Sequence, residues 1–233
     1  MKTALVTLAF LATTLTATAG GGWFIGPMLG ARINGATGDG MDESSTTLGI
    51  TGGANVLGCI GGNFWFDGGV MYTQRGVLLE TPAISLPPFT EIPASQNTAL
   101  FNYLDIVLGI NWYILGDGGM FRPYAGVAVQ PGFFMSGTTT TKIGDDEESQ
   151  DVNSDEVESF HASVMPKIGA DIALGSLLLG AAVGYDLGLT NVNATQGETA
   201  SDLKYNGIVI NVRLAIPLGG GSDEPEVDPM NVD

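Results

Sequence analysis

Eight segments of the chain alternate large apolar residues with small or polar residues at a period of two. One face of each segment carries leucine, isoleucine, valine or aromatic side chains, and the other carries mainly glycine, alanine and isolated charges. A period of two is the spacing of side chains on one face of a β-strand. The sequence therefore predicts an all-β fold with strands at Trp23–Ile33, Leu48–Val56, Phe64–Arg75, Leu104–Trp112, Ala125–Phe133, Phe160–Leu174, Leu177–Leu189 and Gly207–Leu218.

The small-residue face indicates what surrounds these strands. Glycine accounts for 35 of the 233 residues, and it is a poor residue for a strand face exposed to water. Inside a narrow closed barrel, however, glycine makes room for the opposite wall. Segments of about 10 to 12 residues, tilted by about 40°, are long enough to cross a membrane. We therefore predict an eight-stranded antiparallel up-and-down transmembrane β-barrel whose large residues face lipid.

The connections between the segments alternate in length. Three are short, at Leu57–Asn63, Gly116–Gly119 and Gly175-Ser176, and four are long and polar, at Asn34–Thr46, Leu79–Thr98, Ser136–Glu158 and Asn191–Leu203. This is the layout of outer-membrane barrels, with short periplasmic turns and long extracellular loops.

Aromatic residues gather near the strand ends, which is typical of interfacial belts; ordinary aromatic packing in a core is the alternative. The expected belt on the short-turn side is Trp23, Phe64, Phe66, Trp112, Phe121 and Tyr124, and that on the long-loop side is Tyr72, Phe101, Tyr103, Phe133, Phe160 and Tyr205.

The two ends of the chain differ from the middle. Lys2, an apolar run from Ala4 to Leu15 and the small residues Ala17-Thr18-Ala19 are the parts of a secretory signal peptide; a short membrane anchor is the alternative. The tail is acidic and rich in glycine and proline, which favours disorder. We expect a signal peptide at residues 1–19, the barrel at 20–218 and a disordered tail at 219–233.

Charge excludes some classes of function. The chain has 8 Lys+Arg against 25 Asp+Glu, a net charge of −17, so it lacks the basic surface that binding to nucleic acid phosphates requires. A single cysteine, Cys59, excludes a disulfide framework.

Charged residues on the inward face suggest an ion-pair network in the lumen. With a two-residue turn after the sixth strand, Lys167 faces Gly184 and has Asp186 as its diagonal neighbour. Arg75 and Asp105 lie near the outer ends of neighbouring strands. Because an eight-stranded barrel is just filled by side chains, we interpret the set as a structural plug; a polar pore lining is the alternative. The residues are Arg32, Asp67, Arg75, Asp105, Lys167, Asp171, Asp186 and Arg213.

Neither catalysis nor metal binding is expected. The single histidine, His161, has Ser159 and Ser163 nearby, but a lone polar residue at the rim is better explained as lumen lining than as half of a hydrolase pair. The run Asp151-x-Asn153-x-Asp155 resembles the start of an EF-hand, yet it lacks the required glycine and the final glutamate. We expect no cofactor and no enzymatic activity.

Four motifs resemble the PorT-type outer-membrane β-barrel family. They are Tyr72-Thr73-Gln74-Arg75-Gly76, Tyr103-Leu104-Asp105-Ile106, Arg122-Pro123-Tyr124-Ala125-Gly126 and the run from Tyr185 to Asn191, in the same order as in the family. The resemblance implies an OmpA-like eight-stranded barrel and little about activity. The sequence departs from the family at Val107, where proline is usual, and at Ile216-Pro217-Leu218, where such barrels end on an aromatic residue.

From these observations we expect a monomer embedded in outer-membrane lipid. Its role would be structural, or would be contact with an unidentified extracellular ligand or partner through the acidic loops. A small pore or ligand-binding barrel is one alternative, and a soluble periplasmic lipid-binding β-barrel is another.

Overall fold

The computed structural model describes residues 22–38, 44–81, 83–85, 91–144, 146–152, 157–191 and 203–218. The predicted signal peptide and tail lie outside these residues. The described chain forms twelve β-strands: β1 (Trp23–Gly38), β2 (Ser44–Ser45), β3 (Thr47–Gly61), β4 (Phe64–Thr81), β5 (Ile84–Ser85), β6 (Glu91–Ile92), β7 (Ser95–Tyr113), β8 (Phe121–Ile143), β9 (Asp146–Val152), β10 (Phe160–Leu174), β11 (Leu177–Gly188) and β12 (Leu203–Leu218).

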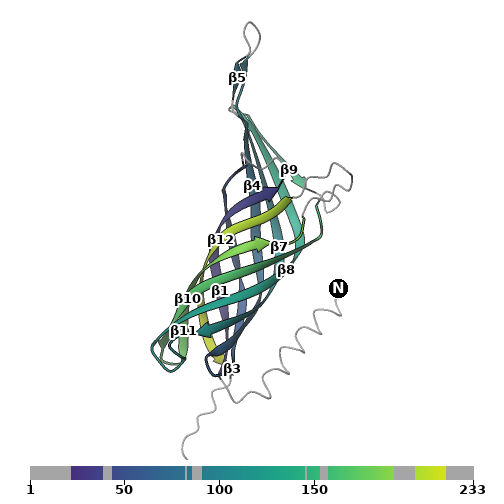
Figure 1. Cartoon of the computed structure of the whole chain (residues 1–233). Coiled ribbons are helices and arrows are strands. Elements are labelled where there is room, and N and C mark those ends of the chain that lie inside the picture. The colour runs from purple at the N-terminus through teal and green to yellow at the C-terminus, as the bar shows by residue number, and fades with distance from the viewer. Residues whose placement is uncertain are drawn as a thin grey trace, which may run out of the picture.

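Eight of these strands close into a ring (Figure 1). The order around the ring is β10, β11, β12, β1, β3, β4, β7 and β8, and β8 pairs back to β10. Every pairing in the ring is antiparallel. Apart from Leu189, these strands contain the eight predicted segments in the predicted order, so the eight-stranded up-and-down barrel is confirmed. Among the described residues, no helix is long and apolar enough to cross a membrane.

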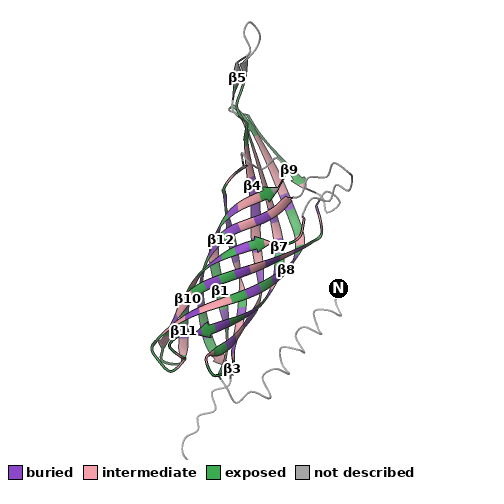
Figure 2. Cartoon of the chain, in the orientation of Figure 1, coloured by how far each residue is buried: buried purple, intermediate pink, exposed green. Residues whose placement is uncertain are grey.

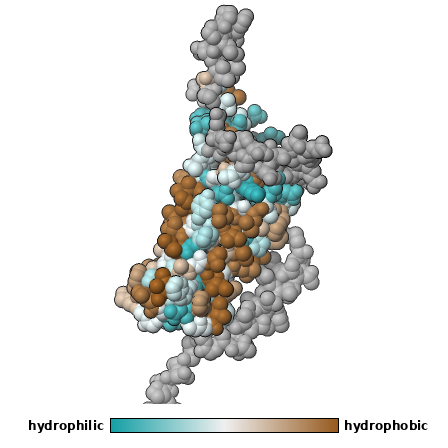
Figure 3. All heavy atoms as spheres, viewed as in Figure 1, coloured by the Kyte–Doolittle hydropathy of each residue, from teal (hydrophilic) through white to brown (hydrophobic). Residues whose placement is uncertain are grey.

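The two faces of the wall are separated as the alternation predicts. Along the strands of the ring, buried positions mostly alternate with exposed or half-buried ones (Figure 2). In β12, for example, Val209 is 4 % exposed and its neighbour Ile210 is 47 % exposed. The exposed positions form a belt of hydrophobic residues over the barrel wall, coloured brown in Figure 3. A lipid environment is the physical reason why so many large apolar residues lie on the outside.

At one end of the barrel the strands are joined by short turns. Gly175 and Ser176 form the predicted two-residue turn, with Leu174 paired to Leu177, and Gly175 adopts a φ of 64°. That backbone conformation is accessible to glycine without strain. The connection predicted at Leu57–Asn63 is shorter than expected, because β3 and β4 continue almost to their shared turn.

At the other end, three neighbouring strands continue beyond the ring. β3 pairs with β4 only as far as Thr73, and β10 pairs with β8 only as far as Phe133, whereas β4, β7 and β8 remain paired to one another up to Thr81, Ser95 and Ile143. We call this extension the projecting sheet: residues 76–81, 95–100 and 138–143, together with β9 and β2. Figure 1 shows it rising above the ring towards the short β5–β6 pair.

Because of the projecting sheet, the prediction of loops at Leu79–Thr98 and Ser136–Glu158 is wrong in part. Large parts of both are paired strands, since β-branched Thr138–Thr141 favour extended backbone and Gly144, with a φ of 61°, permits a tight turn into β9. The loop predicted at Asn191–Leu203 falls almost wholly outside the described residues.

The predicted aromatic belts are correct only in part. Phe64, Trp112, Phe121, Phe133 and Phe160 are exposed on the outside of the barrel, and Trp23, Phe66 and Tyr72 are half-buried. Four other predicted belt residues point into the lumen instead. Each occupies an inward position of the strand alternation, which fixes its direction regardless of how near it lies to a strand end: Phe101, Tyr103, Tyr124 and Tyr205.

Candidate functional site in the barrel lumen

The structure places all eight predicted lumen charges inside the barrel, each at most 8 % exposed. Ion pairs connect them into two groups. The outer cluster lies towards the projecting sheet and comprises Arg32, Arg75, Asp105 and Asp186. The inner cluster lies towards the short turns and comprises Asp67, Lys167, Asp171 and Arg213.

In the outer cluster, the carboxylate of Asp186 pairs with two arginines. The guanidinium of Arg32 lies 2.6 Å from the Asp186 carboxylate, and that of Arg75 lies 3.3 Å away. Arg75 also contacts Asp105 at 3.0 Å, as expected for two residues near the outer ends of neighbouring strands. Two positive and two negative side chains therefore neutralise one another in a space that is closed to solvent.

In the inner cluster, the carboxylate of Asp67 pairs with two positively charged side chains. The Lys167 ammonium lies 2.5 Å from its carboxylate and the Arg213 guanidinium 3.2 Å, and Asn111 donates a hydrogen bond to it at 3.0 Å. Arg213 also pairs with Asp171 at 2.8 Å. As in the outer cluster, the four formal charges cancel.

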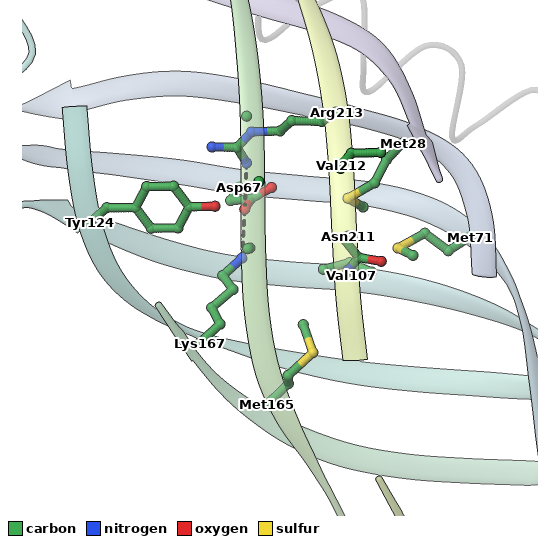
Figure 4. A pocket seen from close by; sticks show the side chains of 13 residues that line it. Met28, Asp67, Met71, Val107, Tyr124, Met165, Lys167, Asn211, Val212 and Arg213 are labelled. Atoms are coloured by element: carbon green, nitrogen blue, oxygen red, sulfur yellow. Dashed lines mark hydrogen bonds and ion pairs between the residues drawn. The ribbon is translucent and has the colours of Figure 1, made fainter. Parts of the chain in front are cut away.

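The pairing predicted for Lys167 is wrong. Its register is as predicted, with Lys167 opposite Gly184, but the side chain reaches across the lumen to Asp67 rather than to Asp186 (Figure 4). Asp186 is instead held by Arg32 and Arg75. In a narrow barrel of tilted strands, a long side chain can meet a residue of a non-adjacent strand as readily as its diagonal neighbour.

Uncharged residues outside the predicted set of eight lumen charges complete the inner cluster. Asn55 donates to Asp67 at 3.3 Å, and the Tyr113 hydroxyl donates a hydrogen bond to Asp171. The ring of Tyr124 lies 5.1 Å from the guanidinium carbon of Arg213, within cation–π range. All three occupy inward positions of their strands. The alternation of inward and outward positions is therefore the signal that could have predicted them as lumen residues.

An apolar layer lies between the two clusters. Met28, Met71, Val107 and Ala128 form a buried group, and along β4 the inward position of Met71 falls between those of Asp67 and Arg75. A cavity of about 20 Å³ adjoins this layer and the inner cluster (Figure 4). A cavity needs about 10–15 Å³ to hold one water molecule, so this space accommodates little more than one.

Aromatic clusters pack at both ends of the lumen. Phe101, Tyr103, Val157 and Tyr205 form the one nearest the projecting sheet. The cluster at the short-turn end consists of Leu57, Trp65, Tyr113, Tyr124, Leu178 and Ala215. Side chains therefore fill the lumen along its length, from the outer aromatic cluster through both ion clusters to the inner one.

His161 lies within the outer aromatic packing. Its ring centroid is 5.8 Å from that of Tyr103 and 6.2 Å from that of Tyr205, and both His161 and Ser163 are at most 1 % exposed. The part of the chain that the structure describes contains no group of three His, Cys, Asp or Glu residues able to hold a metal ion. The residues 153–156 of the EF-hand-like run fall outside it.

A closed ring of eight antiparallel strands with an apolar outer face and a filled, charged interior defines a transmembrane β-barrel. Residues 12–193 match the family model described as "Outer membrane protein beta-barrel domain", so the chain belongs to this family. The protein lies in the cell outer membrane. The alternative of a soluble periplasmic barrel is therefore wrong. In such barrels the short turns face the periplasm and the longer connections face outside.

Solved structures of other outer-membrane barrels are similar to the chain. Neisserial surface protein A has 13 % sequence identity and a TM-score of 0.44, over 82 % of this chain and 96 % of that one. OprG from Pseudomonas aeruginosa has 13 % identity and a TM-score of 0.43, over 85 % and 96 %. Ail of Yersinia pestis has 12 % identity and a TM-score of 0.36, over 84 % and 99 %. No curated protein sequence matches the chain.

Proposed function

We propose that the barrel is sealed and that the protein acts at the cell surface, by contact between its projecting sheet and an extracellular partner. The observation that carries this proposal is the filled lumen. Arg32, Arg75, Asp105 and Asp186 are each at most 1 % exposed and are paired with one another. Buried charges that are already paired with one another do not offer a water-filled path for ions or solutes.

The projecting sheet has the properties of a contact surface. Its outermost strand, β9, carries Asp146, Glu147, Glu148 and Asp151, all exposed. The strands of the ring supply a rigid base for it, because β4, β7 and β8 run without interruption from the barrel wall into the sheet. The protein would act as a monomer anchored in outer-membrane lipid, and its acidity argues against nucleic acid as the partner.

Within the outer-membrane β-barrel family, we propose membership of the PorT-type group. The support is the four motifs in order, and each contributes a residue to the lumen packing. Arg75, Asp105 and Asp186 belong to the outer cluster, and Tyr124 packs against Arg213 in the inner one.

Conductance separates a sealed barrel from the alternative, a small pore. Purified protein inserted in planar bilayers should give no discrete channel events, with a large general porin as the positive control. Reproducible single-channel steps from the folded protein would overturn the sealed barrel and favour the pore.

A matched deletion tests the surface role. Gly137–Thr139 pair with Gln150–Val152, so residues 140–149 can be replaced by Asn-Gly, a favoured hairpin turn, while the ring is left intact. Proteoliposomes carrying either form would be passed over a panel of immobilised proteins of differing charge. The shortened form should fold normally and lose adhesion; undiminished adhesion across the panel would contradict the proposal.

A further inference from the structure

The strand β9 forms a free edge of the projecting sheet. It pairs with β8 on one side, and within the described part of the chain no strand pairs with its other side. Six of its seven residues are exposed. The unpaired N–H and C=O groups of such an edge form a ready template for another extended chain.

The β8–β9 hairpin is held in its extended form by its own sequence. Four consecutive threonines, Thr138–Thr141, are β-branched and favour strand geometry, and the hydroxyls of Thr140 and Ser149 lie 3.0 Å apart across the hairpin. Ile143 pairs directly with Asp146 across the tight turn that contains Gly144. An edge that is already ordered binds a partner at a lower entropic cost than a flexible loop does.

The charges of β9 favour one kind of occupant. Glu147 and Asp151 lie on one face of the strand, whereas Asp146 and Glu148 lie on the other, because side chains alternate. In the paired segments 137–143 and 146–152, the only basic residue is Lys142, opposite Glu147. Edge-to-edge pairing with a second copy would oppose like charges, which is destabilising. A strand that carries lysine or arginine would meet a carboxylate whichever face its charges occupy.

We propose that β9 is a docking strand to which an extended, lysine- or arginine-rich polypeptide segment adds edge to edge. Main-chain hydrogen bonds would supply the pairing, and cross-strand contacts with the carboxylates would select basic sequences. The inference rests on the proposed surface function and names the chemical class of its partner.

The first experiment separates strand addition from simple charge attraction. The full protein in lipid nanodiscs is titrated with a fluorescent peptide of alternating lysine and threonine, about as long as β9. A matched peptide of alternating lysine and proline has the same charge but cannot continue a β-ladder. The lysine–threonine peptide should bind about tenfold more tightly than the proline peptide. Equal affinities would overturn strand addition.

The second experiment locates the site with charge-matched variants. Glu147→Gln with Glu148→Gln removes one carboxylate from each face of β9, whereas Glu80→Gln with Asp117→Asn removes the same charge at β4 and at a short turn. The β9 variant should bind the lysine–threonine peptide about fivefold more weakly, and the control variant less than twofold more weakly. Equal losses would assign the binding to net charge and overturn a site on β9.

The two proposals fail in distinguishable ways. If the shortened hairpin abolishes adhesion to the protein panel but neither peptide prefers β9, the surface function stands and the basic-strand partner is overturned. If adhesion survives the deletion, the surface function of the hairpin fails irrespective of the peptide results.

Discussion

The ammonium group of Lys167 on β10 lies 2.5 Å from the carboxylate of Asp67 on β4, with β7 and β8 between the two strands in the barrel wall. The contact joins residues 100 positions apart in the sequence. It crosses the lumen rather than running along one wall, so it links opposite parts of the ring and contributes to closing the interior.

Removing Lys167 should destabilise the barrel. In the Lys167→Met variant, Asp67 keeps Arg213 and Asn111 but loses its shortest ionic contact, and breaking a buried pair costs about 3–5 kcal/mol. Because Arg213 compensates in part, the lower end of that range is expected for the free energy of unfolding, measured by urea titration in lipid vesicles.

A double-mutant cycle identifies the partner. Lys167→Met combined with Asp67→Asn should cost less than the sum of the two single changes, by about 1 kcal/mol or more, because the residues are in direct contact. Lys167→Met combined with Asp105→Asn should be nearly additive, since Asp105 belongs to the outer cluster. The reverse pattern would show that the lumen pairing differs from the one described.

Charge on the outer wall should be tolerated only near the rim. Leu108 lies near the middle of the part of β7 that belongs to the ring, residues 101–113, and is 47 % exposed, whereas Leu189 follows the outer end of β11 and is 57 % exposed. Leu108→Arg should cost about 2–4 kcal/mol and Leu189→Arg about 0–1 kcal/mol, because the penalty depends on depth in the bilayer. Equal costs in vesicle-based unfolding would contradict the placement of the membrane.

The direction of each side chain was predictable, but its partner was not. Strand parity alone places Lys167, Asp67 and Asp186 inside the barrel. Which of the two aspartates Lys167 meets depends on the tilt and stagger of the strands, and local alternation does not encode these. The same parity, applied consistently, would have assigned Tyr103 to the lumen instead of to an aromatic belt.

The projecting sheet was missed for a different reason. Alternation between apolar and polar residues identifies the strands of the barrel wall, but Thr138–Thr141 and β9 have no apolar face because both sides of the sheet meet water. What identifies these strands is the β-branched run and the glycine at the turn. Such signals mark a hairpin but do not reveal that it continues a barrel strand.

Close backbone contact should make Gly26 intolerant of substitution. A Cβ atom at Gly26 would overlap the backbone oxygen of Leu214, whereas one at Gly35 on the same strand would meet no heavy atom within 4 Å. Gly26→Ala should therefore cost at least about 1–3 kcal/mol, because the backbone must shift. Gly35→Ala serves as the matched control and should leave the unfolding midpoint almost unchanged; similar effects of both would contradict the close approach of β1 and β12.

Enlarging the space between the two ion clusters should weaken the barrel without opening it. Met71 is 4 % exposed and lines the small cavity beside the inner cluster. Met71→Ala should cost about 2–5 kcal/mol, the usual range for truncating a buried methionine.

The same variant should not open a channel. The ion pairs of Arg75 and the packing of Tyr103 remain on one side of the enlarged space, and the ion pairs of Arg213 remain on the other. The variant should therefore stay electrically silent in planar bilayers. Channel activity in Met71→Ala but not in Met71→Leu would show that the methionine layer alone, and not the ion clusters, seals the lumen.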